Sequence, residues 1–395
     1  MQPLIDKAVK AGVPVALPGG DIPVDALSIS GPVHIVGVPG QTRLVARSGG
    51  NLLTIESGSD VVISGVTFDG GPRQPGDDHA LVTCQAVDGL VIENCHFMNS
   101  GGSGLRLQGC SGRVTASRLS QIAKTALFAR DSRGLEISGN DLEDIGNNGI
   151  QVWTSTSAED GTLVYNNRIS KVAAEDGGTG QNGNGINVFR AGNVVVTGNR
   201  ISDCAFSAIR NNAGSNCQIS NNSISRTGEV AIYCEFGFEG AIVNGNLLED
   251  VALGISITNF NEGGRLASVA NNIIRRVTGG GSLPYTRAVG IGAEADTLVT
   301  GNVIEEARDI GISLGWGGYA RNLVANGNLL RNCGRGIVFS VSDGAEGAMI
   351  INNRIAGCTN ESIVGADHGS PETSDLGLPG IEIPKGTRID GNMVN

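Results

Sequence analysis

Short apolar segments recur at a nearly constant spacing along most of this chain. Eleven segments open with a small residue followed by Ile or Leu, and four successive starts, at Gly185, Ala208, Ala231 and Gly254, lie at regular 23-residue intervals. Each unit continues with a turn, a second short strand, and an Asn two residues before Ile, Leu or Val. Segments this short leave no room for the helices of leucine-rich or α-solenoid repeats. The pattern therefore predicts an all-β solenoid of about twelve coils.

One Asn occupies the same turn of each coil. Asn tolerates the left-handed backbone conformation of a sharp turn, and stacked Asn side chains can form hydrogen bonds from coil to coil. We therefore expect these side chains to form one line along the solenoid. The positions are Asn140, Asn167, Asn199, Asn222, Asn246, Asn272, Asn302, Asn328, Asn353 and Asn392.

These turns, written GNxI or NNxI, and the segment LIDKAVKAGVPVALPGG at 4–20 resemble the pectate-lyase-like superfamily. The resemblance implies a single-stranded right-handed parallel β-helix with a short N-terminal capping helix. Segments 185–265 and 290–316 are similar to a bacterial family of twin-arginine-exported repeat proteins, a resemblance that implies export and no particular activity.

A solenoid lengthens without splitting into domains, so we expect a single domain over 1–395. It would comprise an N-terminal cap with the first coils (1–50), regular coils (51–365), and a C-terminal loop with a last partial coil (366–395). The loop at 366–380 is too polar and too rich in Gly and Pro for another coil. We expect it to fold across the C-terminal opening before a partial coil at 387–394, which would protect the last strand edge.

Composition fits this architecture and narrows the partners. The chain has 61 Gly for turns, 40% hydrophobic residues, and a net charge of −11. No apolar run approaches the ~18 residues of a membrane span. The charge argues against nucleic acid and, less firmly, against a strongly anionic polymer. A monomer and a homo-oligomer both remain open.

The N-terminus begins directly with an amphipathic helix and shows no signal peptide, which taken literally indicates a cytoplasmic protein. The family resemblance implies a removed export signal, and we favour a periplasmic or secreted location. The cysteines do not decide between a cytoplasmic and an exported location. Cys333 and Cys358 should stack about 4.8 Å apart in adjacent coils, a spacing that permits a disulfide, although buried thiols are expected.

Metal-ligand and nucleophile motifs are lacking, and we expect no cofactor. The loops GDDH at 76–79 and ADHG at 366–369 place carboxylates beside His. Neither matches the acidic motifs of the β-helical polygalacturonases, so both are weak candidates for function.

The repeat predicts which side chains face outward. In the strand small-Ile-x-Val-x, the second and fourth residues face the core, and the third and fifth face solvent. Aromatic rings beside amides and carboxylates on one face suit a sugar and its hydroxyls, so we expect a poly- or oligosaccharide as substrate. The outward residues near the middle are Trp153, Asn187, Phe189, Arg210, Asn212, Tyr233, Glu235, Thr258 and Glu294.

Two insertions, 172–184 and 277–289, lengthen their coils to 36 residues. Long loops in a compact repeat are often functional. We expect them to rise at the coils opening at 185 and 290, framing a cleft about 19 Å long. The alternative is that both insertions are merely tolerated and the aromatics only cover a sheet.

Within that cleft two chemistries are open. Glu235 and Glu294 should lie two coils, about 9.6 Å, apart, with Thr258 between them, a separation that suits an inverting glycosidase or a related transferase. Arg210 and Tyr233 could instead transfer protons in a lyase or epimerase acting on uronic acids, and the resembling lyases commonly use Ca²⁺. We favour the carboxylate pair, because Glu235 and Glu294 would repel a uronate.

Further polar and aromatic residues flank this face. Asn261 and Glu262, in NFNEGGR at 259–265, are expected to overhang the cleft, and Trp316 to extend it. A third hypothesis is a non-catalytic glycan-binding or envelope scaffold protein. A scaffold would spread its aromatics along the chain, whereas here they gather near the middle, so we favour an enzyme.

Overall fold

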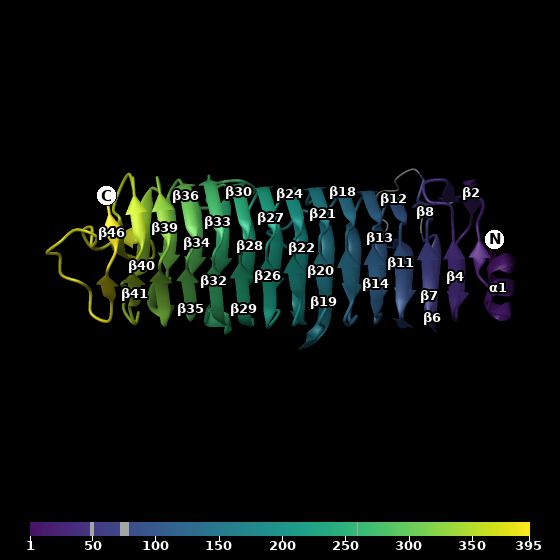
Figure 1. Cartoon of the computed structure of the whole chain (residues 1–395), viewed down its shortest axis with the longest axis horizontal. Helices are drawn as coiled ribbons and strands as arrows, with labels where there is room; N and C mark the ends of the chain where they lie inside the picture. The colour runs from purple at the N-terminus through teal and green to yellow at the C-terminus, as the bar shows by residue number, and fades with distance from the viewer. Residues whose placement is uncertain (48–50, 72–78, 259) are drawn as a thin grey trace. The chain divides into compact units, whose positions relative to one another are not determined.

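The computed structural model describes residues 1–47, 51–71, 79–258 and 260–395. The chain divides into two compact units, Met1–Cys204 and Ala205–Asn395. Each unit is an all-β parallel solenoid, and together the described residues form about 13 turns (Figure 1). This confirms the predicted fold class. The expectation of a single domain stays a prediction.

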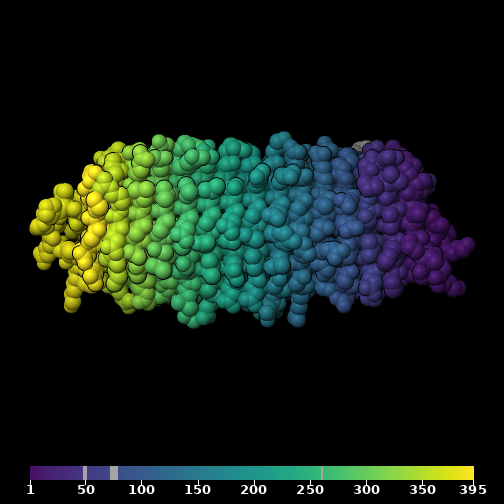
Figure 2. All heavy atoms as spheres, viewed as in Figure 1, coloured from purple at the N-terminus to yellow at the C-terminus, as the bar shows by residue number. Residues whose placement is uncertain are grey.

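Each coil contributes one strand to each of three parallel sheets, called A, B and C. In one coil of unit 1, β17 (Glu136–Ser138) belongs to sheet A, β18 (Asp141–Ile145) to sheet B and β19 (Asn148–Glu159) to sheet C. The Asn turn joins sheet A to sheet B. The repeated segments that open with a small residue form sheet C. Figure 2 shows that the atoms of successive coils are in contact within each unit.

Unit 1 begins with α1 (Gln2–Ala11), which buries Ile5 and Ala8, as predicted for a capping helix. Besides β17, the strands of sheet A in unit 1 are β1 (Val15–Ala16), β4 (Val33–Val36), β7 (Val61–Ser64), β11 (Leu90–Glu93), β14 (Gly112–Thr115), β20 (Leu163–Tyr165) and β23 (Val195–Thr197). Besides β18, those of sheet B are β2 (Gly20–Val24), β5 (Thr42–Ala46), β8 (Thr67–Asp69), β12 (His96–Ser100), β15 (Arg118–Ile122), β21 (Arg168–Val172) and β24 (Arg200–Cys204). Besides β19 and the short β10 (Val87–Asp88), those of sheet C are β3 (Leu27–Ser30), β6 (Leu53–Ser59), β9 (Ala80–Gln85), β13 (Ser103–Gln108), β16 (Thr125–Arg130) and β22 (Asn184–Gly192).

Unit 2 repeats the arrangement and adds the 3₁₀ turns η1 (Phe260–Glu262) and η2 (Gly317–Tyr319). Its strands in sheet A are β26 (Cys217–Ser220), β29 (Glu239–Asn244), β32 (Arg265–Ala270), β35 (Thr297–Thr300), β38 (Leu323–Asn326), β41 (Ala348–Ile351) and β45 (Arg388–Asp390). Those in sheet B are β27 (Ser223–Thr227), β30 (Leu247–Val251), β33 (Ile273–Val277), β36 (Val303–Ala307), β39 (Leu329–Arg331), β42 (Arg354–Ala356) and β46 (Met393–Val394). Those in sheet C are β25 (Ile209–Asn212), β28 (Val230–Glu235), β31 (Leu253–Ile257), β34 (Val289–Ala293), β37 (Ile310–Leu314), β40 (Arg335–Ser340), β43 (Ile363–Asp367) and the antiparallel β44 (Ser370–Pro371).

The core consists of stacked aliphatic side chains. In sheet C of unit 2 the second position of every strand motif is a fully buried Ile that pairs with the next one. The preceding residue must be small, because a Cβ on Gly254 would lie 2.2 Å from the carbonyl oxygen of Gly290. The Ile column is Ile209, Ile232, Ile255, Ile291, Ile312, Ile337 and Ile363.

The predicted Asn line is confirmed within each unit. In unit 1 the Nδ2 of Asn140 donates to Oδ1 of Asn167, and that of Asn167 to Asn199, each at 3.0 Å. In unit 2 the ladder runs from Asn222 to Asn392. The expected left-handed backbone was assigned to the wrong residue, because positive φ occurs at the residue before each ladder Asn, as at Asn271 (56°).

Asn272→Ala should lower the free energy of unfolding by at least about 2 kcal/mol, because several buried groups would lose their partners. Asn272 donates to Val243 O at 3.1 Å, and its Oδ1 accepts from the backbone and side-chain nitrogens of Asn246, each at 2.9 Å. Chemical denaturation measures the change. Asn271→Gly is the matched control and should stay within about 0.5 kcal/mol, because glycine suits the positive φ there. Equal losses in both variants would contradict the ladder's role.

The C-terminal segment covers the last strand of sheet C, as predicted. β44 pairs antiparallel with β43, and the Asp375 carboxylate accepts hydrogen bonds from the backbone nitrogens of Ser362 and Ile363 at 2.9 and 3.1 Å. The partial coil then follows as β45 and β46, which pair with β41 and β42.

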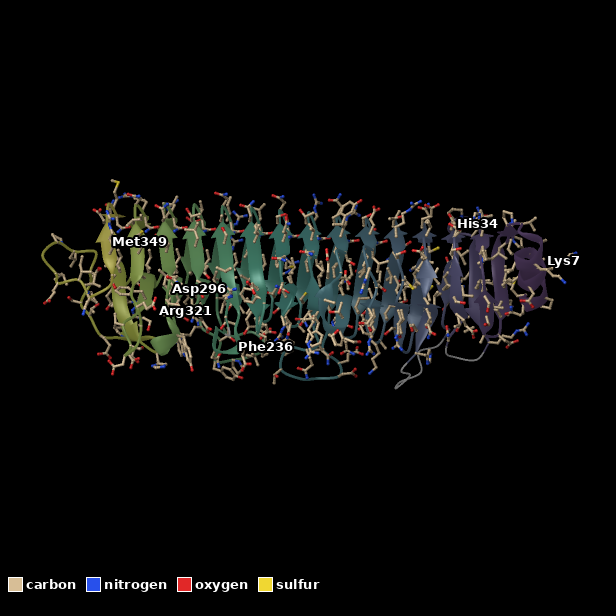
Figure 3. The ribbon with its side chains drawn as sticks, turned by 90° about the horizontal axis from the view of Figure 1, so that it is seen from below. Lys7, His34, Phe236, Asp296, Arg321 and Met349 are labelled. Atoms are coloured by element: carbon tan, nitrogen blue, oxygen red, sulfur yellow. The ribbon has the colours of Figure 1, made fainter. Side chains whose placement is uncertain are left out.

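Surface side chains of neighbouring coils also pair, as Arg321 and Asp296 do at 2.8 Å (Figure 3). All eight cysteines are free thiols, and Cys333 is buried while Cys358 is half-buried.

Candidate functional site

The outer face of sheet C in unit 2 carries the predicted columns. Arg210, Tyr233 and Ser256 stack in one column, and Asn212 pairs with Glu235 in the next. Ile232 and Cys234, between these outward residues, are fully buried. The inward positions are therefore buried as predicted, whereas of the two positions expected to face solvent Tyr233 is half-buried and Glu235 is buried.

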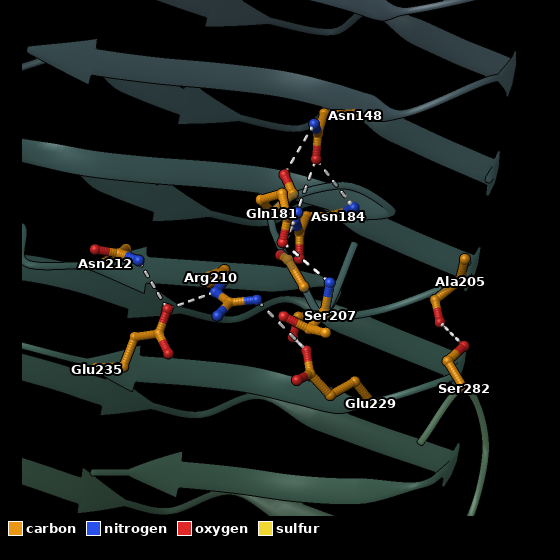
Figure 4. Close-up of polar contacts among 12 residues, drawn as sticks. Asn148, Gln181, Asn184, Ala205, Ser207, Arg210, Asn212, Glu229, Glu235 and Ser282 are labelled. Atoms are coloured by element: carbon orange, nitrogen blue, oxygen red, sulfur yellow. Dashed lines mark hydrogen bonds and ion pairs between the residues drawn. The ribbon is translucent and has the colours of Figure 1, made fainter. Parts of the chain in front are cut away.

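A buried charged cluster occupies this face (Figure 4). The Nε of Arg210 donates to Oε1 of Glu235 at 2.5 Å, and Nδ2 of Asn212 donates to the same oxygen at 2.8 Å. On the other side, Nη1 of Arg210 lies 3.7 Å from Oε2 of Glu229, which accepts a hydrogen bond from Ser207 Oγ at 2.9 Å. The side chains of Arg210, Glu229 and Glu235 are only 11%, 8% and 3% exposed. The cluster therefore holds one cation between two carboxylates.

Burial and neighbouring charges set the protonation of this cluster. Burial by itself lowers the pKa of Arg210, but the hydrogen bond and charge of Glu235, with Glu229, raise it overall. Burial raises the pKa of Glu229, and Arg210 only partly offsets that effect. The guanidinium thus remains charged and has no free electron pair, so Arg210 is poorly suited to abstract a proton.

Tyr233 lies beside this cluster, with the guanidinium carbon of Arg210 5.2 Å from the centroid of its ring. Burial raises the pKa of Tyr233 well above its ordinary value, and the charges of Glu235 and Glu229 add to the effect. The phenol therefore stays protonated at neutral pH. It can donate a proton, and it cannot serve as a base without first losing one.

Glu294 lies in a groove farther along the same face of unit 2. The groove has a volume of about 150 Å³ and an apolar floor that includes Val289, Ile310 and Val338. Glu294 is half-buried, and its Oε1 accepts a hydrogen bond from Thr258 Oγ1. The polar and aromatic lining comprises Ser256, Thr258, Arg287, Glu294, Ser313, Trp316, Ser340 and His368.

His368 reaches this groove from the C-terminal loop. Its Nδ1 lies 2.7 Å from Oδ1 of Asp367, which also accepts a hydrogen bond from Ser342. These two hydrogen bonds, the one from Ser342 first, lower the pKa of Asp367. The His368 ring meets the ring of Trp316 edge-on, with centroids 5.5 Å apart. The groove therefore combines an oriented imidazole, a carboxylate and an indole that is 45% exposed.

The predicted residues of unit 1 form an aromatic row on sheet C. Trp153 pairs with Phe189, their ring centroids 5.1 Å apart, and Gln151 pairs with Asn187. Asn187 is only 5% exposed, and its Oδ1 has no hydrogen-bond partner among the described residues. Trp153 also lines a depression next to the first insertion.

The insertions turn back to earlier coils, although Arg287 of the second also lines the groove beside Glu294, in the coil that opens at 290. The first lies beside the coils opening at 126 and 149, because Asp176 bonds to Asn147 and Lys124. The second reaches back in unit 2, where Ser282 N donates to Gly228 O at 2.8 Å and Ser282 Oγ donates to Ala205 O (Figure 4). Both insertions turn back along the chain to carbonyl and side-chain groups of earlier coils.

Other predicted site residues are scattered. Trp316 lies in the groove, whereas Asn261 and Glu262 are exposed in η1 and do not line it. Asn259 and residues 76–78 of the GDDH loop lie outside the described residues. The predicted cleft runs over both units and stays a prediction.

Comparisons with known proteins agree on the fold. Residues 41–169 match the family model "Right handed beta helix region". Among solved structures, the A-module of mannuronan C-5 epimerase AlgE4 from Azotobacter vinelandii superimposes with a TM-score of 0.54 and 16% identity, covering 77% of this chain and 90% of that one. Pre-mature gene product 12 of bacteriophage phi29 gives 0.51 and 13% over 95% of this chain and 56% of that one. No curated protein matches the sequence.

These likenesses establish a right-handed β-helix fold and no particular reaction. Structural neighbours include other carbohydrate-active β-helix enzymes, such as the catalytic domain of a GH87 α-1,3-glucanase with a TM-score of 0.49 and 15% identity, covering 98% of this chain and 67% of that one. No helix in the described part of the chain is long and apolar enough to cross a membrane. Within the same residues, no group of three or more His, Cys, Asp or Glu side chains is placed to hold a metal ion.

Sequence reasoning missed three residues of this face. Glu229 keeps the outward parity of Tyr233 and Glu235, so extending the two-residue alternation toward the N-terminus would have found it. Arg287 belongs to an insertion that was recognised without assigning its side chains. The loop of His368 was noted, but its sequence gave no sign that it meets the coil of Glu294.

Proposed function

We propose that this protein is a carbohydrate-active enzyme whose active site is the groove on sheet C of unit 2. The observation that carries the proposal is the shared lining of that groove. Glu294, held by Thr258, and His368, held by Asp367, lie there with the exposed indole of Trp316. Titratable groups held by their own hydrogen bonds beside an aromatic surface suit acid–base chemistry on a sugar.

In this proposal the reaction is cleavage or transfer at a glycosidic bond. Glu294 and Glu235 serve as acid and base, in either order, as inverting enzymes require. Thr258 supports Glu294, whereas Arg210 and Asn212 fix Glu235. Because the Glu235 side chain is only 3% exposed, Glu294 is the group better placed to meet a substrate. His368 offers a second proton carrier in the same groove.

A second candidate is a lyase or epimerase acting on a uronic acid, the reaction predicted above for Arg210 and Tyr233. Arg287 favours it, because its side chain lines the groove and brings a positive charge there. Such a cation can neutralise a uronate carboxylate. Tyr233 would act as the proton donor, because its raised pKa keeps the phenol protonated until the reaction. Arg210 would have a positioning and stabilising role and would not accept a proton. A calcium-dependent form remains part of this candidate.

The test is a panel of neutral and uronic polysaccharides, assayed for new reducing ends and for the ultraviolet absorbance of unsaturated uronates. Reducing ends without absorbance would support the hydrolase, and both signals together would support the lyase. Isomerisation of uronate units without cleavage would identify the epimerase. Binding to a polysaccharide with no reaction would replace the proposal by the scaffold alternative, and no binding to any polymer would refute it.

An exported location belongs to this proposal, because the expected polysaccharides lie outside the cytoplasm. The twin-arginine resemblance supports the same location. Fractionation of cells that naturally produce the protein would test it.

A further inference from the structure

Gly292 lines the groove of unit 2 from within strand β34. Its backbone pairs with Ser256 of β31 on one side and with Ser313 of β37 on the other. Glycine weakens the interior of a strand, because it has no side chain to pack and loses more conformational freedom on folding than other residues. A glycine at such a position marks either a constraint on the backbone or a place that a ligand approaches closely.

The backbone places no such constraint on Gly292. Its φ lies outside the left-handed region that favours glycine. A Cβ built there would come no closer than 4.0 Å to any described residue other than its chain neighbours, which is ordinary van der Waals contact. On Gly290, two positions earlier in the same strand, a Cβ would instead lie 2.6 Å from the carbonyl oxygen of Gly311. The missing side chain of Gly292 therefore leaves space in the groove that the fold does not need.

Aliphatic side chains border this space. A Cβ on Gly292 would lie 4.0 Å from Val289 Cγ1, and Val289 and Ile310 belong to the apolar cluster that lines the groove. Ser256 and Ser313, which flank Gly292 in the same outward column, line the groove too. A methyl group gains by burial against the aliphatic side chains, whereas a sugar hydroxyl there would lose hydrogen bonds to water. The serine hydroxyls can donate to an oxygen beside that methyl group.

The space over Gly292 lies within reach of a sugar bound at Glu294. Glu294 is two residues beyond Gly292, directly after β34 ends, and both line the groove. Two residues of a strand span about 7 Å, so a sugar ring at Glu294 can place one substituent over Gly292. The exposed indole of Trp316 borders the same groove and offers a face for that ring.

We propose that the groove selects a sugar that carries an acetyl group. The acetyl methyl packs against Val289 and Ile310 in the space over Gly292, and the acetyl carbonyl oxygen accepts a hydrogen bond from Ser256 or Ser313. An amide-linked and an ester-linked acetyl group share this chemistry. The position of the sugar rests on the active site proposed above, whereas the choice of substituent rests on Gly292. Gly292 is then the specificity-determining residue of the groove.

Fluorescence of Trp316 measures binding to this groove. The chain has two Trp, so in Trp153→Phe the remaining Trp316 reports on the groove. The probes are two pairs of sugars that differ in acetylation: N,N′-diacetylchitobiose with cellobiose for the amide, and mono-O-acetylated xylobiose with xylobiose for the ester. In at least one pair, we expect the acetylated sugar to bind about tenfold or more tightly than its counterpart. Calorimetric titration repeats each measurement without the fluorophore.

Gly292→Val, made in Trp153→Phe, should weaken binding of the preferred acetylated sugar about tenfold or more, because its methyl groups fill the space that the acetyl group needs. Its melting temperature should stay the same or rise, since valine suits a strand better than glycine. Ser268→Val is the matched control and should bind normally, because Ser268 is half-buried on sheet A and does not line the groove. Gly254→Ala should lower the melting temperature, because its Cβ would lie 2.2 Å from the carbonyl oxygen of Gly290.

Three results would overturn the inference: equal affinity within both pairs, no binding of any probe, or unchanged affinity in Gly292→Val. A Gly292→Val variant that fails to fold would also count against it, because the glycine would then serve the backbone.

The same measurements separate this inference from the proposed reaction. Acetyl-dependent binding without turnover of any polysaccharide would support the acetyl site and count against the enzyme. Turnover that is equal in Gly292→Val and in the unsubstituted protein would support the enzyme and refute the acetyl site.

Discussion

Glu294→Gln is expected to lower turnover of the proposed glycan substrate about 100-fold or more while leaving the fold intact. The amide keeps the shape of the side chain, and it still accepts the hydrogen bond from Thr258. It loses the ability to exchange a proton at the reacting atoms. Initial rates on the substrate found in the polysaccharide panel, with thermal melting as the folding check, measure the effect.

Glu305→Gln is the matched control for this prediction. Glu305 belongs to β36, the second strand after Glu294, on sheet B, and pairs with Arg331. Its turnover should equal that of the unsubstituted protein. Glu235→Gln should also lose activity if the two carboxylates work as a pair, whereas the lyase mechanism makes Tyr233→Phe the more damaging change. Full activity in both Gln variants would refute the carboxylate pair.

Arg210→Met should lower the free energy of unfolding by about 3–5 kcal/mol, because it leaves two buried carboxylates without their cation. The Glu229 and Glu235 side chains are 8% and 3% exposed, so water can replace little of the lost interaction. The exposed pair of Arg331 and Glu305 provides the comparison, and Arg331→Met should cost no more than about 1 kcal/mol. Urea denaturation of the two variants distinguishes the cases. Equal losses would show that the cluster is not held by Arg210.

The same cluster predicts a pH dependence. The pKa of Glu229 is already raised in the folded protein by burial. A carboxyl with a raised pKa binds more protons folded than unfolded, so its contribution to stability falls as pH rises through the window above its ordinary pKa. Removing Arg210 should widen that window. The loss of unfolding free energy caused by Arg210→Met should therefore become smaller as pH is lowered toward about 4. A loss that is independent of pH would contradict this account.

The sequence by itself determined the architecture, because each coil repeats the environment of the one before. The small residue before Ile232 and its equivalents, the outward position of Tyr233, and the ladder that includes Asn272 all depend on contacts with the adjacent coils. Such contacts recur at a fixed spacing, so aligning the repeats is equivalent to reading the sheet register. The sequence analysis placed the left-handed residue of each turn one position too late, at the ladder Asn. The ladder hydrogen bonds explain why that residue is Asn, but they do not show which residue of the turn has a positive φ.

Only the tertiary structure decided how the candidate site is assembled. Glu235 was predicted to face solvent, yet its side chain is only 3% exposed, because Arg210 and Asn212, one coil earlier, donate hydrogen bonds to its carboxylate. The loop carrying His368 joins the groove of Glu294 through Trp316 and Asp367, which no repeat register encodes. Insertions break the period, so their direction depends on whichever polar groups of the neighbouring coils they meet.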